Sequence, residues 1–128
     1  MGARYFGAAV PRREDERLLT GRGRYVADVA LPGTLHVAVA RSPHAHARIV
    51  RVDATGARRR PGVVVVLAPA DVVALPRLPL LVPHPSLTAP MCPELLPREV
   101  VSYAGQAVAV VVAETPAQAE DALEHLTI

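Results

Sequence analysis

Large aliphatic residues alternate with small or polar ones shortly after the first quarter of the chain. The alternating residues are Leu35, His36, Val37, Ala38, Val39 and Ala40. A period of two predicts a β-strand with one face packed on a core. Residues 47–53 predict a second strand in which Val50 and Val52 share a face, and a Ser-Pro pair at 42–43 interrupts the run between them. We therefore expect an antiparallel pair of strands joined by a short connection.

Weaker helix and strand signals follow in the middle of the chain. Residues 54–60 predict at most two turns of helix, weakened by Gly56 and ended by a Pro-Gly pair at 61–62. The uninterrupted aliphatic run at 63–67 predicts a strand covered on both faces, because no polar position alternates within it. A short helical turn at 69–73 should follow this strand.

Prolines concentrate in residues 74–97, which hold seven of the chain's thirteen. Fixed φ angles and missing amide donors at this density exclude a helix or a central strand, so this proline-rich segment should be extended and loop-like. Its large aliphatic residues include Leu78, Leu80, Leu81, Val82, Leu87, Leu95 and Leu96. A segment this apolar should lie against the domain itself or against a neighbouring protein, and a structural ordering role is favoured over a proline-motif ligand.

The last third of the chain predicts two strands and a helix. The strands cover 99–103 and 107–113 around a Gly-Gln turn at 105–106, and the second is apolar throughout, as expected of a central strand. A cap, a first-position proline and a capping-box glutamine open a helix at 115–118. Its buried stripe should contain Ala119, Ala122, Leu123 and Leu126, with Glu120, Asp121 and Glu124 facing water.

The sequence shows no return strand after this helix. A helix packed on a sheet normally leads back to the sheet through a right-handed crossover. We therefore expect an N-terminal fragment, a truncated reading frame or one half of a split subunit, with a sheet edge open to pairing.

Composition narrows the classes of function. A length of 128 residues suits one domain, and a single cysteine excludes an internal disulfide framework. All fourteen basic residues are arginines, but the four aromatic residues are too few and scattered for a base-stacking platform, so no nucleic-acid partner is expected. Neither a signal peptide nor a membrane-span pattern is found. We expect a soluble cytoplasmic protein with no membrane partner.

Few residues offer catalytic or metal-binding chemistry. His44 and His46 would share one side of an extended segment near His36, but no third ligand is identifiable, so hydrogen-bonded or surface histidines are favoured over a metal site. Cys92 would need a base to act as a nucleophile; His84 is near in sequence, but the prolines between them define no geometry. The Gly-Gln turn lacks the helix start of a phosphate cradle. We assign no catalytic, cofactor-binding or metal-ligating residue.

Two longer stretches carry a resemblance to a known family. Residues 12–49 read RREDERLLTGRGRYVADVALPGTLHVAVARSPHAHARI, and residues 103–122 read YAGQAVAVVVAETPAQAEDA, with a leader GAAVPRRED at 7–15. Their order and spacing resemble the N-terminal α/β hammerhead domain of molybdenum hydroxylase large subunits. This is the family of xanthine dehydrogenases, aldehyde oxidases and carbon monoxide dehydrogenases, in which the Gly-Gln turn resembles a fixed structural feature.

The resemblance implies an α/β (α+β) fold, the α/β hammerhead, with a mixed sheet and short helices. The family has a C-terminal return strand at the point where this sequence shows none. The resemblance implies one domain over residues 1–128, with a leader at 1–24 and the proline-rich segment as an internal loop. Residues 13–19 themselves predict a short charged helix with Leu18 and Leu19 as its apolar edge. In the family, the molybdenum-binding domains lie downstream of this region.

For the parent protein, the resemblance implies an oxidoreductase in which this domain acts structurally. Such large subunits carry molybdenum on molybdopterin, often as the cytosine dinucleotide, and hydroxylate aldehydes or N-heterocycles or oxidise carbon monoxide. Their 2Fe-2S clusters and FAD lie on companion domains or subunits. This chain alone should bind no cofactor and is not expected to be active by itself. Its implied partners are a downstream molybdenum-binding half, in cis or in trans, and the iron–sulfur and flavin subunits.

An alternative function of a different class, without catalysis, also stays open. The chain would then be a stand-alone, non-catalytic protein-interaction module or a degenerate remnant of the same family. The intact cap, strand patterns and turn glycines indicate a fold that is still specified, which favours the hydroxylase domain.

Overall fold

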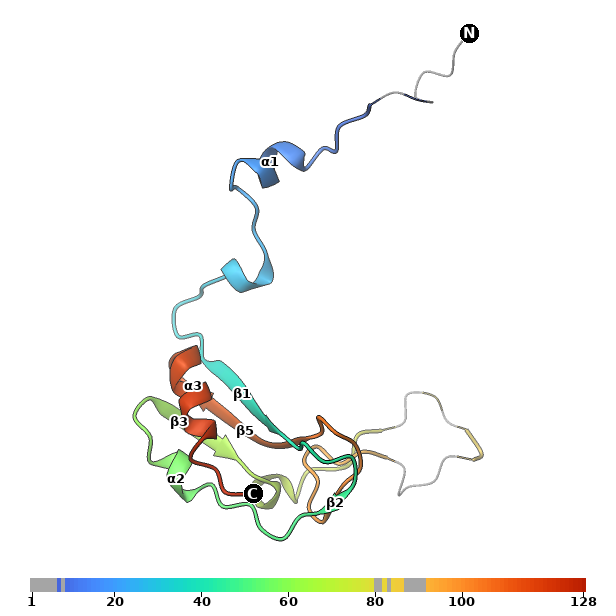
Figure 1. Cartoon of the computed structure of the whole chain (residues 1–128), viewed down its shortest axis with the longest axis vertical. Helices are drawn as coiled ribbons and strands as arrows, with labels where there is room; N and C mark the ends of the chain where they lie inside the picture. Colours follow the sequence, from blue (N-terminus) through green and yellow to red (C-terminus); the bar gives the residue numbers. More distant parts are fainter. Residues whose placement is uncertain (1–6, 8, 80–81, 83, 87–91) are drawn as a thin grey trace. The chain divides into compact units, whose positions relative to one another are not determined.

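The computed structural model describes residues 7, 9–79, 82, 84–86 and 92–128, which fall into two compact units (Figure 1). The first unit, Met1–Thr34, contains the short helix α1 (Asp15–Leu19) and the 3-10 turn η1 (Val26–Asp28). The charged helix expected at 13–19 is therefore confirmed. All residues of α1 and η1 are at least partly exposed within the structure.

The second unit, Leu35–Ile128, is built on a three-stranded sheet in the order β1-β5-β3. Its strands are β1 (His36–Arg41), β5 (Ala107–Ala113) and β3 (Val63–Leu67). The apolar strand β5 is central, as its composition predicts. The α/β class with short helices is confirmed, and the ladders among the described residues are antiparallel, so this sheet is not mixed in strand direction.

The predicted pairing of β1 with the segment that follows it is wrong. β1 pairs with β5 instead, and Ala38 lies opposite Val111. The following segment forms only β2 (Ala47–Arg48), which pairs with β4 (Val100–Val101) in a separate two-stranded sheet. Val50 is 88% exposed and belongs to neither sheet. Alternation indicates a strand and its two faces, but the partner is set by contacts between residues far apart in sequence.

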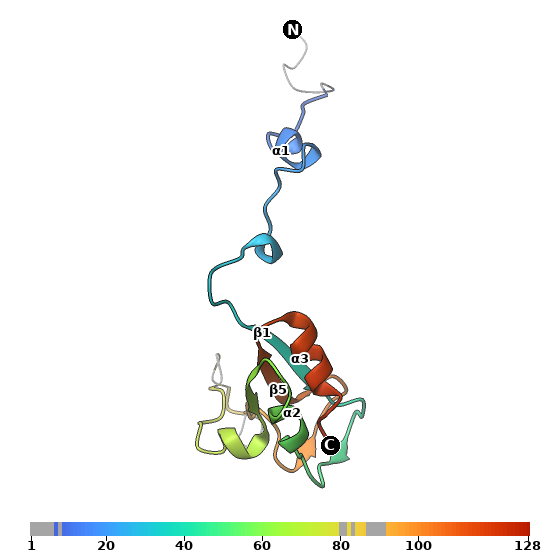
Figure 2. The ribbon, with the colours of Figure 1, turned by 90° about the vertical axis from the view of Figure 1, so that its left-hand side faces the viewer.

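Two helices cover one face of the three-stranded sheet (Figure 2). α2 (Thr55–Arg58) is as short as predicted, and α3 (Pro116–Leu123) begins after the predicted cap, where Thr115 Oγ1 accepts a hydrogen bond from the backbone N–H of Gln118 at 3.3 Å. The buried residues of this layer are Ala38, Ala54, Ala57, Val66, Ala68, Val111, Ala113, Ala119 and Ala122. The stripe predicted for α3 is confirmed, with Leu123 and Leu126 packed at its border.

β3 lies at the edge of the sheet, and within this chain the prediction that both of its faces are covered is wrong. Val66 is 2% exposed, whereas Val64 and Val65 are 54% and 41% exposed. A continuous β-branched run shows that both faces are apolar. It does not show that something within the same chain covers them.

The described residues of the proline-rich segment contain neither helix nor strand, as predicted, and follow the 3-10 turn η2 (Pro69–Val72). Leu96 is 5% exposed, so this end of the segment packs against its own domain, whereas Leu78 and Leu95 are 45% and 43% exposed. The predicted apolar positions Leu80, Leu81 and Leu87 lie outside the described residues.

After α3 the chain pairs once more with an earlier segment. Thr127 and Asp53 exchange two backbone hydrogen bonds of 2.8 and 3.1 Å, which form an isolated antiparallel bridge. The residues beyond α3 therefore contribute a single bridge rather than a strand of the main sheet. In the part of the chain that the structure describes, no helix has both the length and the apolar character needed to span a bilayer.

Candidate functional site

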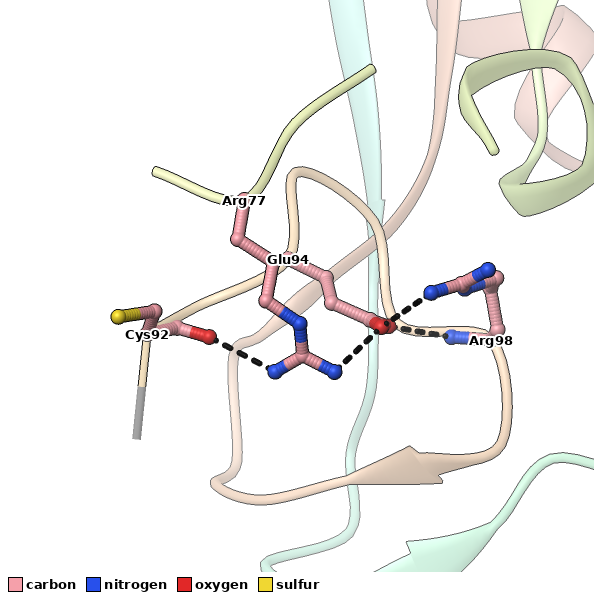
Figure 3. A network of polar contacts seen from close by, with 4 residues as sticks. All are labelled: Arg77, Cys92, Glu94 and Arg98. Atoms are coloured by element: carbon pink, nitrogen blue, oxygen red, sulfur yellow. Dashed lines mark hydrogen bonds and ion pairs between the residues drawn. The ribbon is translucent and has the colours of Figure 1, made fainter. Parts of the chain in front are cut away.

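A cluster of polar contacts joins the two ends of the proline-rich segment (Figure 3). The Oε1 atom of Glu94 lies 2.8 Å from Nη2 of Arg98 and 3.0 Å from Nη2 of Arg77. Through Nη1, Arg77 also donates a hydrogen bond of 3.0 Å to the backbone carbonyl of Cys92. We call these four residues the arginine–glutamate clamp, because they join Arg77, near the start of the proline-rich segment, to Cys92 and Glu94 near its end.

Two backbone N–H groups donate further hydrogen bonds that reinforce the arginine–glutamate clamp. The N–H of Leu78 donates to the carbonyl of Pro93 at 3.0 Å, and the N–H of Arg98 donates to Oε2 of Glu94 at 3.2 Å. Both carboxylate oxygens of Glu94 therefore accept hydrogen bonds. An anion held in this way is suited to fixing a loop, and poorly suited to accepting a proton from a substrate.

The pKa shifts of Glu94, Arg98 and Asp53 also favour fixed charges over groups that exchange protons. Hydrogen bonding from the Arg98 side chain is the main cause that holds the pKa of Glu94 below its usual 4.5, with burial acting in the opposite direction. The same contact raises the pKa of Arg98. The pKa of Asp53 is lowered chiefly by the hydrogen bond from the backbone N–H of Thr55, at 2.9 Å. All three shifts favour the charged form, so these groups act as fixed charges near neutral pH.

Two hollows adjoin the arginine–glutamate clamp. The first, beside Pro69 and Leu96, holds about 20 Å³, which is room for roughly one water molecule. The second is lined in part by Cys92, Tyr103 and Gln106 and measures about 740 Å³, but it opens to solvent. Neither is an enclosed pocket of the kind that buries most of an organic cofactor.

The histidines do not gather. His36 opens β1, whereas His44 and His46 follow the far end of that strand, and six residues of strand span roughly 17 Å. The backbone around His44 is held by Ser42, whose Oγ accepts from the His44 N–H at 3.1 Å. Among the described residues, no group of three His, Cys, Asp or Glu side chains is placed to hold a metal ion.

Cys92 and His84 have separate surroundings. The hydrogen bond at Cys92 is made by its backbone carbonyl, and its sulfur points away from the ion pairs (Figure 3). The Nδ1 atom of His84 accepts a hydrogen bond from the backbone N–H of Ser86 at 3.2 Å. These contacts do not join the two side chains to each other.

The Gly-Gln turn joins neighbouring segments. The Oε1 atom of Gln106 accepts a hydrogen bond from the backbone N–H of Ser102 at 2.6 Å, and the carbonyl of Gly105 accepts one from Nη1 of Arg41 at 2.9 Å. These contacts agree with the structural part that the resemblance implies for this turn.

Reasoning from the sequence missed the arginine–glutamate clamp. The one local signal is the four-residue spacing of Glu94 and Arg98, which brings opposite charges together when the chain turns. Arg77 lies near the start of the proline-rich segment, seventeen residues before Glu94, so its part in the clamp could not be inferred from spacing.

Comparison with known proteins first places the chain in a class. It is an α/β hammerhead domain, since residues 20–128 match the family described as "Aldehyde oxidase and xanthine dehydrogenase, a/b hammerhead domain". The chain belongs to this family, and the resemblance drawn from residues 12–49 and 103–122 is confirmed.

The relatives are large enzymes of which this chain matches a small part. It is 41% identical, over 95% of its length, to the nicotine 6-hydroxylase large subunit of Paenarthrobacter nicotinovorans, and it spans 16% of that relative. The crystal structure of quinoline 2-oxidoreductase from Pseudomonas putida 86 superposes on 94% of the chain with a TM-score of 0.77 and 48% identity, over 15% of the larger chain. The Cu,Mo-CO dehydrogenase gives a TM-score of 0.77 and 39% identity, over 94% of this chain and 14% of that one.

The described residues do not fit the molybdenum cofactor of the family. A cofactor in which a pterin carries the molybdenum needs a hollow that encloses the pterin, and the hollow of about 740 Å³ next to the arginine–glutamate clamp opens to solvent. Both oxygens of the clamp's one carboxylate are engaged by Arg77 and Arg98. We therefore derive no chemical step through this cofactor from the chain's own residues.

Proposed function

We propose that this chain is the structural N-terminal hammerhead domain of the large subunit of a molybdopterin-dependent hydroxylase or dehydrogenase. The proposed domain covers residues 1–128, with a leader at 1–24 and the proline-rich segment as an internal loop. The domain packs against the molybdenum-binding part of the subunit, which lies either on the same polypeptide (in cis) or on a separate one (in trans). The chain itself performs no chemistry.

The observation that carries this proposal is the match along almost the whole chain to one small part of each relative. The chain shares 41% identity over 95% of its length with a nicotine 6-hydroxylase large subunit while spanning 16% of it. A domain that keeps its fold but gathers no ligand set among its described residues is suited to a supporting role.

The same proposal extends to the assembly. The complete enzyme would hold molybdenum on molybdopterin, as the cytosine dinucleotide, and pass electrons to 2Fe-2S clusters and FAD on companion domains or subunits. Its substrate would be an aldehyde, an N-heterocycle or carbon monoxide. One structure that resembles this chain is of a Cu,Mo-CO dehydrogenase, which supports the metal but does not assign the substrate. We place the assembly in the cytoplasm.

The test is to tag the chain in its native cell, recover it under gentle conditions, and measure molybdenum together with the masses of the co-purifying polypeptides. We expect stoichiometric molybdenum and either a large companion polypeptide or one long polypeptide that contains these residues. Recovery of the chain with neither molybdenum nor a companion would refute the proposal and favour a stand-alone interaction module.

A further inference from the structure

The sheet face turned away from α2 and α3 carries two complete cross-strand rows of aliphatic side chains. In each row, one residue of β5 lies between one residue of β1 and one of β3. The rows are Val37–Val112–Val65 and Val39–Val110–Leu67. Neighbouring residues of a strand point to opposite faces, so both rows lie opposite the helix-covered row Ala38–Val111–Val66. We call this surface the valine face.

The face that the helices cover carries small side chains, whereas the uncovered valine face carries larger ones. On the helix side, Ala38 and Ala113 are 3% and 0% exposed, because small residues allow α3 to pack closely. On the valine face, the larger Val37 and Val65 are 61% and 41% exposed. Single exposed aliphatic residues are ordinary, but adjoining rows across three strands are typical of a surface that another protein surface covers.

The composition of β3 and β5 also indicates that another protein surface covers the valine face. Strands that are buried on both faces have continuous aliphatic sequences, whereas strands with a solvated face alternate with polar residues. Residues 63–67 and 107–113 contain no polar residue. Within the unit Leu35–Ile128, the helices α2 and α3 account for the burial of one face only.

We infer that the valine face is the surface on which the remainder of a family large subunit docks, through an uncharged apolar surface of its own. The inference rests on the proposed function and names the face through which the domain would pack against the rest of the subunit. In the relatives, a domain of this fold makes up 14–16% of the chain, so most of the polypeptide lies beyond it and is available as a neighbour.

Two further arguments define this occupant. The two rows contain no charged or polar side chain, so a charged partner surface would lose its hydration there without compensation. A polypeptide joined to the domain, or assembled with it as one subunit, is present at a much higher effective concentration than a second copy of the chain. The remainder of the subunit is therefore favoured over self-association.

The test uses thiol accessibility in the protein recovered from its native cell. In a Cys92→Ser background, Val37→Cys and Val65→Cys place one thiol on each outer strand of the valine face, and Glu120→Cys is the matched control on the solvent side of α3. In the recovered assembly, we expect maleimide to label the two valine-face thiols roughly tenfold or more slowly than the control thiol, because labelling requires local opening. All three thiols should label alike in denaturant.

The possible outcomes separate this inference from the proposed function. Rapid labelling of Val37→Cys and Val65→Cys in an assembly that contains molybdenum would overturn the docking surface and leave the proposed function standing. Protection of both thiols in a dimer of this chain alone would overturn the stated occupant. Recovery of the chain without molybdenum or a companion would overturn both proposals.

Discussion

Gly105 donates its backbone N–H to the carbonyl oxygen of Ser42 at 2.8 Å, which ties the turn before β5 to the residue that follows β1. The N–H of Ser42 in turn donates to the carbonyl of Gln106 at 2.9 Å. Gly105 has a φ of +88°, in the region that disfavours residues with a Cβ atom. A Cβ atom at this position would have no neighbour within 4 Å, so space for a side chain is not the constraint. Glycine is needed here for its backbone conformation alone.

We therefore predict that Gly105→Ala lowers the free energy of unfolding by about 1 kcal/mol through backbone strain alone. Gly105→Asn should cost less, because asparagine tolerates the left-handed region better than alanine. Urea denaturation followed by circular dichroism would measure both variants. An alanine variant as stable as the parent would show that the turn adopts another conformation in solution.

The arginine–glutamate clamp gives a second prediction, about stability near neutral pH. Glu94→Gln removes both ion pairs from a carboxylate that is 21% exposed, so we expect a loss of about 1 kcal/mol and faster proteolysis within the proline-rich segment. Glu16→Gln is the matched control, because the Glu16 side chain is 83% exposed in its pair with Arg22 and should contribute almost nothing. Equal stability and equal cleavage rates for the two variants would contradict the clamp.

The same carboxyl group predicts a pH dependence. Its pKa in the folded chain lies below the usual 4.5, so the unfolded chain takes up the proton first as the pH falls. The contribution of Glu94 to stability is therefore fully present above pH 4.5 and is lost as the pH falls through the lower folded pKa. The difference in free energy of unfolding between the parent and Glu94→Gln should shrink in that range. A difference that grows on acidification would have the wrong sign.

Local patterns predicted most elements of the fold, because each depends on neighbours in the sequence. The cap at Thr115, the short helix near Gly56 and the apolar centre of β5 all lie close to their expected places. The failures concern pairing and coverage. β1 pairs with β5 rather than with the segment after it, and β3 lies at an edge, since strand order depends on contacts across the whole chain.

The candidate site likewise contains features that local sequence indicates and features that depend on contacts between distant residues. The separation of His36 from His44 and His46 follows from the length of β1, although from the sequence we expected His36 to lie near them. The clamp joins Arg77 to Glu94 across the proline-rich segment, and no sequence period links those two positions. Of the three strands behind the valine face, only β1 has an alternating sequence, and residues 63–67 and 107–113 are apolar throughout. The sequence therefore did not show which face of the sheet the helices cover.

The N-terminal cap of α3 gives a fourth prediction. Thr115→Ala removes the oxygen that accepts the Gln118 N–H at 3.3 Å and should cost about 1 kcal/mol. Thr115→Ser keeps the hydroxyl oxygen and should stay close to the parent. Thermal unfolding of the three proteins would measure the ranking. A serine variant as unstable as the alanine variant would assign the effect to the lost methyl group instead of the cap.

The two faces of the sheet give the last prediction, which compares one substitution at two positions of the isolated chain. Val111 is fully buried under α2 and α3, whereas Val37 is 61% exposed on the valine face. Threonine has nearly the shape of valine, so Val111→Thr chiefly buries a hydroxyl group and should cost about 2 kcal/mol. Val37→Thr leaves its hydroxyl in water and should change the free energy of unfolding by less than about 0.5 kcal/mol. Urea denaturation of both variants measures the difference, and a cost at Val37 as large as that at Val111 would mean that the valine face is already covered in the isolated chain.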